Sequence, residues 1–147
     1  MSAEKQYVDA KKALDIIERE VLPQGQHLTY GGVAEYLGQK PGKNSRHIGQ
    51  VCSLIDSACY WTKLPMLSLE KIRMNNGEHN PDSFDDAFRA VKDRLIANAE
   101  KHDWIPDDIR RIKRSLDSHM HGESALLQWQ HIESFGQAGL DRIASYR

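Results

Sequence analysis

The sequence has no long apolar segment and no excess of charge of either sign. No stretch approaches the ~20 consecutive apolar residues of a membrane-spanning helix, and the polar N-terminus lacks the apolar core of a secretory signal peptide. With 20 basic and 21 acidic residues the net charge is −1, so no overall field attracts the protein to nucleic acid or to a membrane. These absences predict a cytoplasmic protein with no membrane partner.

Residues suited to metal or redox chemistry are also few. The two cysteines, Cys52 and Cys59, stand two turns apart on a predicted helix, ~10 Å, which is too far for a disulfide. We expect both to be buried thiols in a reducing compartment. No Cys-x-x-Cys or His-Glu-x-x-His pattern is present, and the other candidate ligands are scattered histidines (His102, His119, His121, His131). The sequence therefore predicts no metal site and no cofactor.

The stretch 29–50 carries the strongest local signals. Thr29 is a favourable N-cap residue, Val33 and Ala34 follow at helical spacing, and Gly38 is a stop signal. After a turn rich in glycine and proline, the apolar residues of 45–61 fall on one side of a second helix. Two helices joined in this way predict a helix-turn-helix, in which the second helix can enter a nucleic-acid groove.

A short β wing is predicted after the second helix. The segment 67–72 alternates leucines with polar residues, and Asn-Asn-Gly at 75–77 signals a turn. On such a strand Lys71 and Arg73 fall on the same side, which suits contact with phosphates but equally an ordinary solvated face.

These elements define the expected fold. A length of 147 residues with 39% hydrophobic residues allows one ordinary core. Apolar spacing predicts helices over 2–22, 84–101 and 107–120, with a further helical stretch from Glu123. We expect a mainly α protein in which residues 1–80 form an N-terminal helix and a winged helix-turn-helix with a small β wing. Residues 81–147 are expected to form a C-terminal helical extension packed with it as one unit.

The motif resembles a known DNA-binding domain. Thr-Tyr-Gly, then Val-Ala and Leu-Gly, followed by Arg-x-Ile-Gly-Gln, is similar to the DNA-binding domain of the O6-alkylguanine-DNA alkyltransferases and alkyltransferase-like proteins. The similarity covers about residues 28–75, a third of the chain. In that family the arginine fills the gap left by a flipped nucleotide and the tyrosine contacts the displaced phosphate. The resemblance implies these roles for Arg46 and Tyr30, and recognition of damaged or distorted duplex DNA.

The sequence departs from this family at the active site. Where the family has Pro-Cys-His-Arg, this chain has Pro-Met-Leu-Ser at 65–68, without the nucleophilic cysteine or its histidine. Cys59 is another thiol, but His47 is twelve residues away on the same predicted helix, and alkyl transfer requires a thiolate activated by an adjacent histidine. A protein without alkyltransferase activity is therefore expected.

Local charge supports a DNA partner. Residues 27–74 carry six Lys/Arg and three Asp/Glu, a net charge of +3. The predicted DNA-binding residues are the basic and polar side chains in and around the motif: Tyr30, Lys40, Lys43, Ser45, Arg46, Gln50, Lys63, Lys71 and Arg73.

Two other functions stay open. The first is a protein-protein interaction module built on a winged helix, with a protein partner bound through the C-terminal helices. The second is an enzyme that processes nucleic acid, for which Asp82, Asp85 and Asp86 are candidate carboxylates, although they also suit the start of a helix.

Two groups of residues have both a structural and a binding interpretation. Tyr60 and Trp61 suit core anchors or base-stacking surfaces, and core positions are favoured. The second group is a cluster of basic residues on the predicted helix over 107–120: Arg110, Arg111, Lys113 and Arg114. It suits a phosphate-contacting stripe or a solvated helix face, and the solvated face is favoured.

Overall fold

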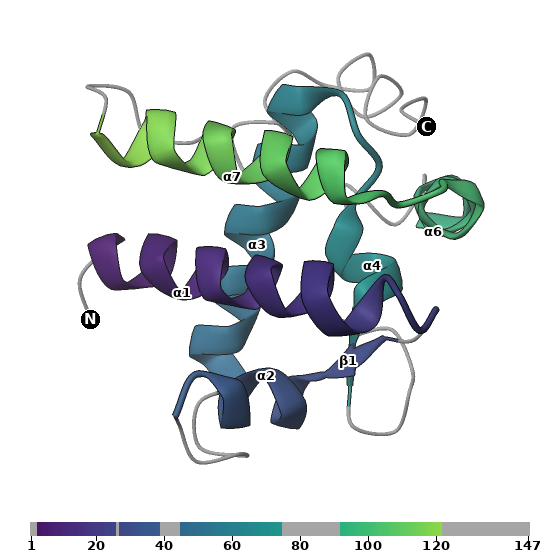
Figure 1. The fold of residues 1–147 in the computed structure, drawn as a ribbon. Helices are drawn as coiled ribbons and strands as arrows, with labels where there is room; N and C mark the ends of the chain where they lie inside the picture. Colours follow the sequence, from purple (N-terminus) through teal and green to yellow (C-terminus); the bar gives the residue numbers. More distant parts are fainter. Residues whose placement is uncertain (1–2, 26, 39–44, 75–91, 122–147) are drawn as a thin grey trace.

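A computed structural model of the chain describes residues 3–25, 27–38, 45–74 and 92–121 (Figure 1). In chain order its elements are α1 (Ala3–Ile16), the π-helical turn η1 (Ile17–Val21), β1 (Leu28–Thr29), α2 (Tyr30–Tyr36), α3 (Ser45–Thr62), α4 (Leu67–Lys71), β2 (Ile72–Arg73), α6 (Lys92–Lys101) and α7 (Pro106–His121). The described part is mainly helical, and no helix in it is long and apolar enough to span a membrane.

Helix α3 is the central element of the fold. Figure 1 shows it running behind α1 and α7, which lie beside each other across it. The predicted apolar side of α3 is buried, but so are residues on its other sides, including Leu54 and Ser57. A helix that is buried nearly all round belongs to the core.

Helices α1 and α7 cover α3 with one apolar stripe each. The stripe of α1 continues into η1 at the predicted positions (Tyr7, Ala10, Leu14, Ile17, Val21), and the stripe of α7 also follows helical spacing (Ile109, Ile112, Leu116). In η1 the helix widens, because the Leu22 N–H donates to the carbonyl of Ile17 five residues earlier (2.9 Å). The predicted helices over 2–22 and 107–120 are therefore confirmed.

Ion pairs join α1 to α7 along their shared edge. Lys11 Nζ lies 2.6 Å from Asp117 Oδ1, and Lys113 pairs with Asp15. These two pairs run in opposite directions between the helices, with the base on α1 in one and on α7 in the other. They account for Lys113, one of the basic residues considered for a phosphate-contacting stripe.

The predicted strand over 67–72 is wrong for residues 67–71, which form helix α4. Leu67, Ser68 and Leu69 are all buried, so the alternation of leucine with polar residues does not mark a half-buried strand. Asp56 of α3 accepts hydrogen bonds from the Ser68 backbone N–H (3.0 Å) and from its hydroxyl. Because the N-cap residue Met66 has no side-chain hydrogen bond, this carboxylate from another helix caps the first turn of α4.

The two short strands pair in parallel. Leu28 lies opposite Ile72 and Thr29 opposite Arg73. A wing formed by a hairpin would need antiparallel neighbours, and the turn predicted at 75–77 lies outside the described residues. The observed fold is a mainly helical protein with a small two-stranded parallel sheet.

Other predicted segments fall partly or wholly outside the described residues. Of the helix predicted over 84–101, the structure describes α6. The carboxylates Asp82, Asp85 and Asp86, His131, and the helical stretch from Glu123 are not among the described residues.

Candidate nucleic-acid interface

The start of α2 has the capped geometry predicted from the motif. Thr29 is extended (φ −97°, ψ 164°), and its hydroxyl oxygen accepts the N–H of Gly32 at 3.0 Å. A Cβ atom on Gly32 would lie 3.3 Å from that oxygen, so glycine fits closely there. The helix ends at Tyr36, and Gly38 follows with a φ of +72°, a conformation that glycine adopts without strain.

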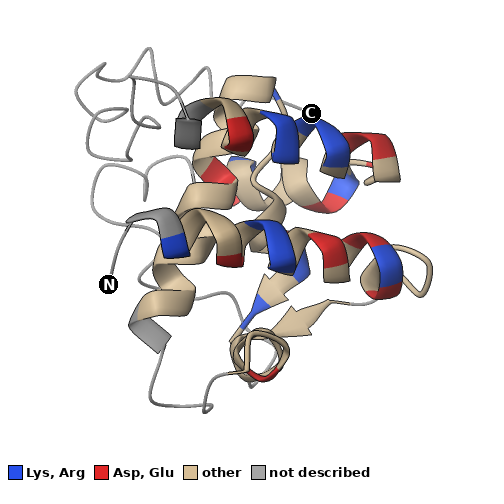
Figure 2. Ribbon diagram, turned by 60° about the vertical axis from the view of Figure 1, so that its left-hand side comes forward, with Lys and Arg blue, Asp and Glu red and all other residues tan. Residues whose placement is uncertain are grey.

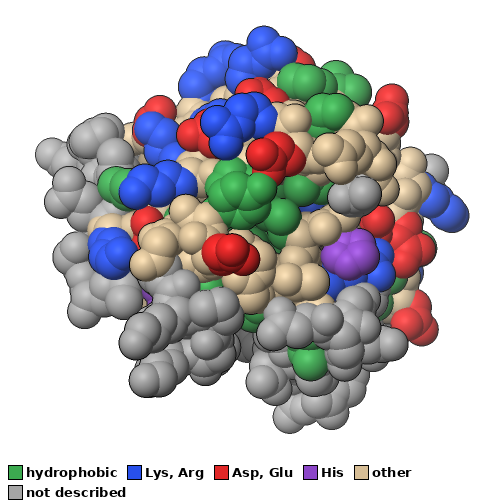
Figure 3. All heavy atoms as spheres, turned by 60° about the horizontal axis from the view of Figure 1, so that its bottom comes forward, with side chains coloured by type: hydrophobic (Ala, Val, Ile, Leu, Met, Phe, Trp, Pro, Cys, Tyr) green, Lys and Arg blue, Asp and Glu red, His purple; other side chains and the backbone are tan. Residues whose placement is uncertain are grey.

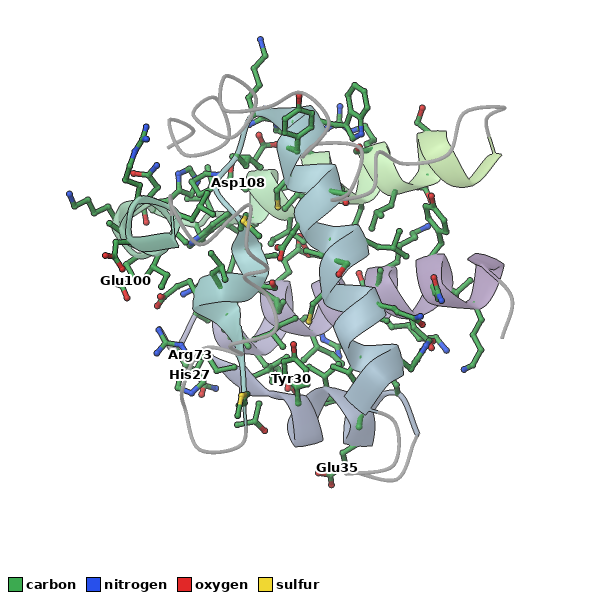
Figure 4. All side chains as sticks on the ribbon, turned by 180° about the vertical axis from the view of Figure 1, so that it is seen from behind. His27, Tyr30, Glu35, Arg73, Glu100 and Asp108 are labelled. Carbon is green, nitrogen blue, oxygen red and sulfur yellow. The ribbon has the colours of Figure 1, made fainter. Side chains whose placement is uncertain are left out.

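Tyr30 joins α2 to α3. Its side chain is half-buried, packs against the core and forms a hydrogen bond with the thiol of Cys52. Figure 4 shows Tyr30 in the interior between α2 and α3, while Glu35 of α2 points away from the molecule. Tyr30 therefore helps to fix α2 on α3, the two helices of the predicted helix-turn-helix.

The first turn of α3 begins at Ser45, as predicted. The backbone of Ser45 and Arg46 belongs to this turn, whereas their side chains, and all of Lys40 and Lys43, lie outside the described residues. The structure therefore places only the backbone of Ser45 and Arg46 among these four predicted DNA-binding residues.

A buried polar pair next to Arg46 was not predicted. His47 Nε2 donates to Asp9 Oδ2 of α1 at 2.7 Å, and each side chain is only 4% exposed. Lys5 Nζ approaches the same oxygen at 3.3 Å. A signal was present in the sequence, because Asp9 precedes Ala13 and Ile16 by four and seven residues and so falls on a buried edge of α1.

Gln50 lies one turn further along α3 at the same contact with α1. Its side chain is exposed, and its Oε1 accepts a hydrogen bond from Gln6 Nε2 at 2.8 Å. The predicted polar surface of α3 is therefore continuous with the edge of α1.

The sheet brings Arg73 close to the start of α2. Because β2 pairs with β1, Arg73 lies opposite Thr29, the residue before Tyr30. Its Nη2 donates to Glu70 Oε2 at 2.9 Å, and Figure 4 shows it at the same edge as His27. Lys71 is the last residue of α4, so the prediction that it falls on the same side of one strand as Arg73 is wrong.

Lys63 lies at the other end of α3 from Arg46. The helix has 18 residues, which separates its ends by roughly 25 Å at ~1.5 Å per residue. Lys63 follows the helix with a φ of +60° and an exposed side chain. Trp61, beside it, is 47% exposed, so the expectation that Trp61 is a core anchor is wrong. Tyr60 is half-buried and meets Trp61 edge to face.

The basic residues of α7 serve several purposes. Arg111 donates to the carbonyl of Thr62 at 2.8 Å and so caps the end of α3. Arg110 and Arg114 are exposed. Figure 2 shows basic and acidic residues interspersed along α1 and α7, which is typical of a solvated face.

Charge on the α2 side of the molecule is mixed. Figure 3 shows described basic and acidic side chains interspersed on this face. On the outer side of α2, Glu35 and Tyr36 line a shallow hollow with Gly32, and the Tyr36 hydroxyl donates to Glu20. A carboxylate there repels phosphate, so the start of α3 suits DNA contact better than the outer side of α2 does.

The segment 65–68, with the sequence Pro-Met-Leu-Ser, is part of the core. All four residues at 65–68 are buried. Cys52 and Cys59 are free and buried, as expected, and burial is the main cause that raises the pKa of both thiols, followed by the nearby Asp56 carboxylate. Both are therefore protonated at neutral pH and poor nucleophiles.

The candidate metal ligands do not form a site in the described part of the chain. His102 donates from Nε2 to Asp108 Oδ2 at 2.9 Å, and the side chains of His119 and His121 lie outside the described residues. Among the residues that the structure describes, no group of three or more histidines, cysteines or carboxylates could hold a metal ion.

The structure thus places Arg73 beside the start of α2 and Tyr30 against Cys52 of α3, whereas Gln50 faces α1 and Lys63 lies at the other end of α3. Comparison with family models, curated proteins and solved structures finds no match for this chain.

Proposed function

We propose that this chain is a non-catalytic DNA-binding protein of the alkyltransferase-like type, which contacts duplex DNA through the first turn of α3, supported by α2. The observation that carries the proposal is the pairing of a capped short helix with a long helix whose start, at Ser45–Arg46, follows Lys40 and Lys43 in the sequence. In Figure 1 this end of α3 lies beside α2 at the edge of the molecule. Helix-turn-helix proteins bind DNA with the start of their second helix.

The charge balance around this unit supports the same partner. Of the three acidic residues in 27–74, Asp56 is buried, Glu70 is paired with Arg73, and Glu35 points away from α3. Because Lys63 is distant and Arg73 is paired, Lys40, Lys43 and Arg46 are the basic residues of the segment that we expect to attract phosphates at the start of α3.

Burial of 65–68 and the protonated thiols support the absence of alkyl transfer. Transfer of a labelled methyl group from DNA to the protein, lost in Cys59→Ser, would overturn the non-catalytic assignment.

The proposal also includes the finer architecture, a winged helix, which requires a β hairpin after β2 in residues outside the described part.

A salt series of binding measurements tests the proposal. Wild type, Arg46→Ala and Lys43→Ala are titrated with plain, mismatched and O6-alkylguanine duplexes. Lys43→Ala should weaken binding to every duplex and lower the salt slope by ~1, whereas Arg46→Ala should cost ~1–3 kcal/mol and reduce the preference among duplexes. Arg114→Ala, which removes one exposed positive charge from α7, is the matched control and should bind like wild type.

The opposite result supports an interaction module instead. If wild type fails to bind any duplex at low salt, or if Arg46→Ala binds as tightly as wild type throughout, the DNA-binding proposal is wrong. The exposed Trp61 and Ile105 would then be the first side chains to test for a protein partner, since large exposed apolar residues are enriched in interfaces.

A further inference from the structure

Helix α1 is attached to the start of α3 by a polar contact in the core. Asp9 Oδ2 accepts hydrogen bonds from His47 Nε2 at 2.7 Å and from Lys5 Nζ at 3.3 Å. Within the described residues the other ring nitrogen of His47, Nδ1, is buried without a hydrogen-bond partner. Burying these polar groups costs free energy, and their hydrogen bonds offset this cost only while the geometry of the contact is kept. An apolar pair in the same place would not carry the cost.

The surrounding apolar contacts are less specific. Close to Asp9, the buried residues of α1 include the small Ala10 and Ala13. Such small, nondirectional contacts define the register of two helices less sharply than a buried hydrogen-bonded pair does. Any shift of α1 on α3 would separate the buried Asp9 from His47, its closest partner across the two helices, at a cost of several kcal/mol. The pair therefore selects one register of α1 on α3.

His47 follows Arg46 directly, so this register also fixes the first turn of α3. The bond between Gln6 and Gln50, one turn further along α3, lies at the same contact (2.8 Å). Two polar links thus connect α1 to the part of α3 that the proposed function places against DNA.

We infer that Asp9 and His47 are positioning residues for DNA binding, which hold the first turn of α3 in its binding orientation from α1. This inference rests on the proposed function. It makes α1 part of the binding apparatus, although α1 lies outside the two-helix unit. It also assigns a role to the buried pair that differs from simple stabilisation.

The first test separates binding from stability. In the double variant Asp9→Leu/His47→Leu the polar pair is replaced by apolar side chains, which often leaves stability unchanged or raises it. Its melting temperature should equal or exceed that of wild type, while its Kd for a plain duplex should rise about 10-fold. A purely structural pair predicts unchanged binding in this folded variant.

The second test uses two single variants that differ in reach. In His47→Gln the amide nitrogen can replace Nε2 as the donor to Asp9, whereas in His47→Asn the side chain is too short. Both are measured at a temperature where circular dichroism shows native helix content. His47→Gln should bind within about 3-fold of wild type, and His47→Asn should lose about 10-fold.

The outcomes distinguish the two proposals. If wild type binds DNA, Arg46→Ala weakens binding, and the Leu/Leu and Asn variants still bind like wild type, the positioning inference is wrong and the proposed function stands. If wild type does not bind DNA at low salt, the proposed function fails and the positioning inference fails with it.

Discussion

Asp9 and Asp56 are two buried carboxylates that attach neighbouring helices to α3, and their partners differ in kind. Asp9 accepts hydrogen bonds from His47 and Lys5, which are both bases. Asp56 accepts from the N–H and the hydroxyl of Ser68, which are both neutral donors, and it forms no ion pair within the described residues.

The neutral donors do not fully replace water around Asp56. Burial raises the pKa of its carboxyl from 3.8 to about 7, although both hydrogen bonds from Ser68 oppose this rise. The contact of α3 with α4 should therefore depend on pH, whereas the contact of α1 with α3 should depend on keeping both members of a pair.

The largest expected effect is the pH dependence caused by Asp56. Its pKa in the folded state lies above the unfolded value, so between about pH 4 and pH 7 the folded protein holds a proton that the unfolded chain has released. The contribution of Asp56 to the free energy of unfolding should therefore fall as the pH rises through this window, by up to roughly 4 kcal/mol.

Asp56→Asn removes this titration. Its amide oxygen can still accept the Ser68 N–H, and its amide nitrogen can donate to the Ser68 hydroxyl oxygen. Urea unfolding at several pH values should show wild type losing stability relative to Asp56→Asn as the pH rises from about 4 to 7. Parallel pH profiles for the two proteins would show that Asp56 does not titrate in this range.

Removing His47 gives the next largest effect. His47→Ala leaves the buried Asp9 without its closest partner and should lower the free energy of unfolding by about 3 kcal/mol. Gln50→Ala, at the same helix contact but exposed, should change it by less than ~0.5 kcal/mol. Equal effects of the two substitutions in urea unfolding would contradict the special importance of the buried pair.

Thr29→Ala measures a hydrogen bond without a buried charge. Loss of the cap on Gly32 should cost about 1 kcal/mol, less than the loss of His47. Thr29→Ser keeps the hydroxyl and is the control, expected within ~0.5 kcal/mol of wild type in thermal unfolding. If Thr29→Ser is as destabilised as Thr29→Ala, the methyl group and not the hydrogen bond stabilises this turn.

Lys5→Ala should have the smallest effect. The Lys5 side chain is 46% exposed, so its ion pair with Asp9 should contribute about 0.5 kcal/mol or less, and high salt should reduce this further. A loss as large as that of His47→Ala would mean that Lys5, and not His47, is the main partner of Asp9.

The sequence was sufficient to predict the elements whose signals are local. The spacing of Tyr7, Leu14 and Val21 predicted α1 with η1, and the Thr29 cap and Gly38 stop predicted α2. The glycine- and proline-rich turn and the apolar spacing after it also predicted where α3 begins. In each of these segments, periodicity and end signals agree along a continuous piece of chain.

Features that depend on distant residues were not predicted. Helix α4 is capped by Asp56, twelve residues earlier, and β2 pairs with β1 across most of the helix-turn-helix. The charge count along the chain placed Lys63 in the candidate site. Lys63 instead follows the last turn of α3, and the length of this helix separates it from Arg46. The Asp9–His47 pair joins residues 38 apart, so helical spacing indicates only that Asp9 falls on a buried edge of α1.

The packing of α1 on α7 has a consequence for synthesis of the chain. Lys11 meets Asp117, 106 residues later, and α1 shares its apolar stripe between α3 and α7. At ~5–20 residues per second, roughly 5 to 18 s separate the completion of α1 from the start of α7 on the ribosome. During that interval α1 lacks one of its two neighbours, and contacts so distant in sequence form slowly. We expect nascent chains that stop before α7 to bind chaperones and to be cut readily by proteases within α1.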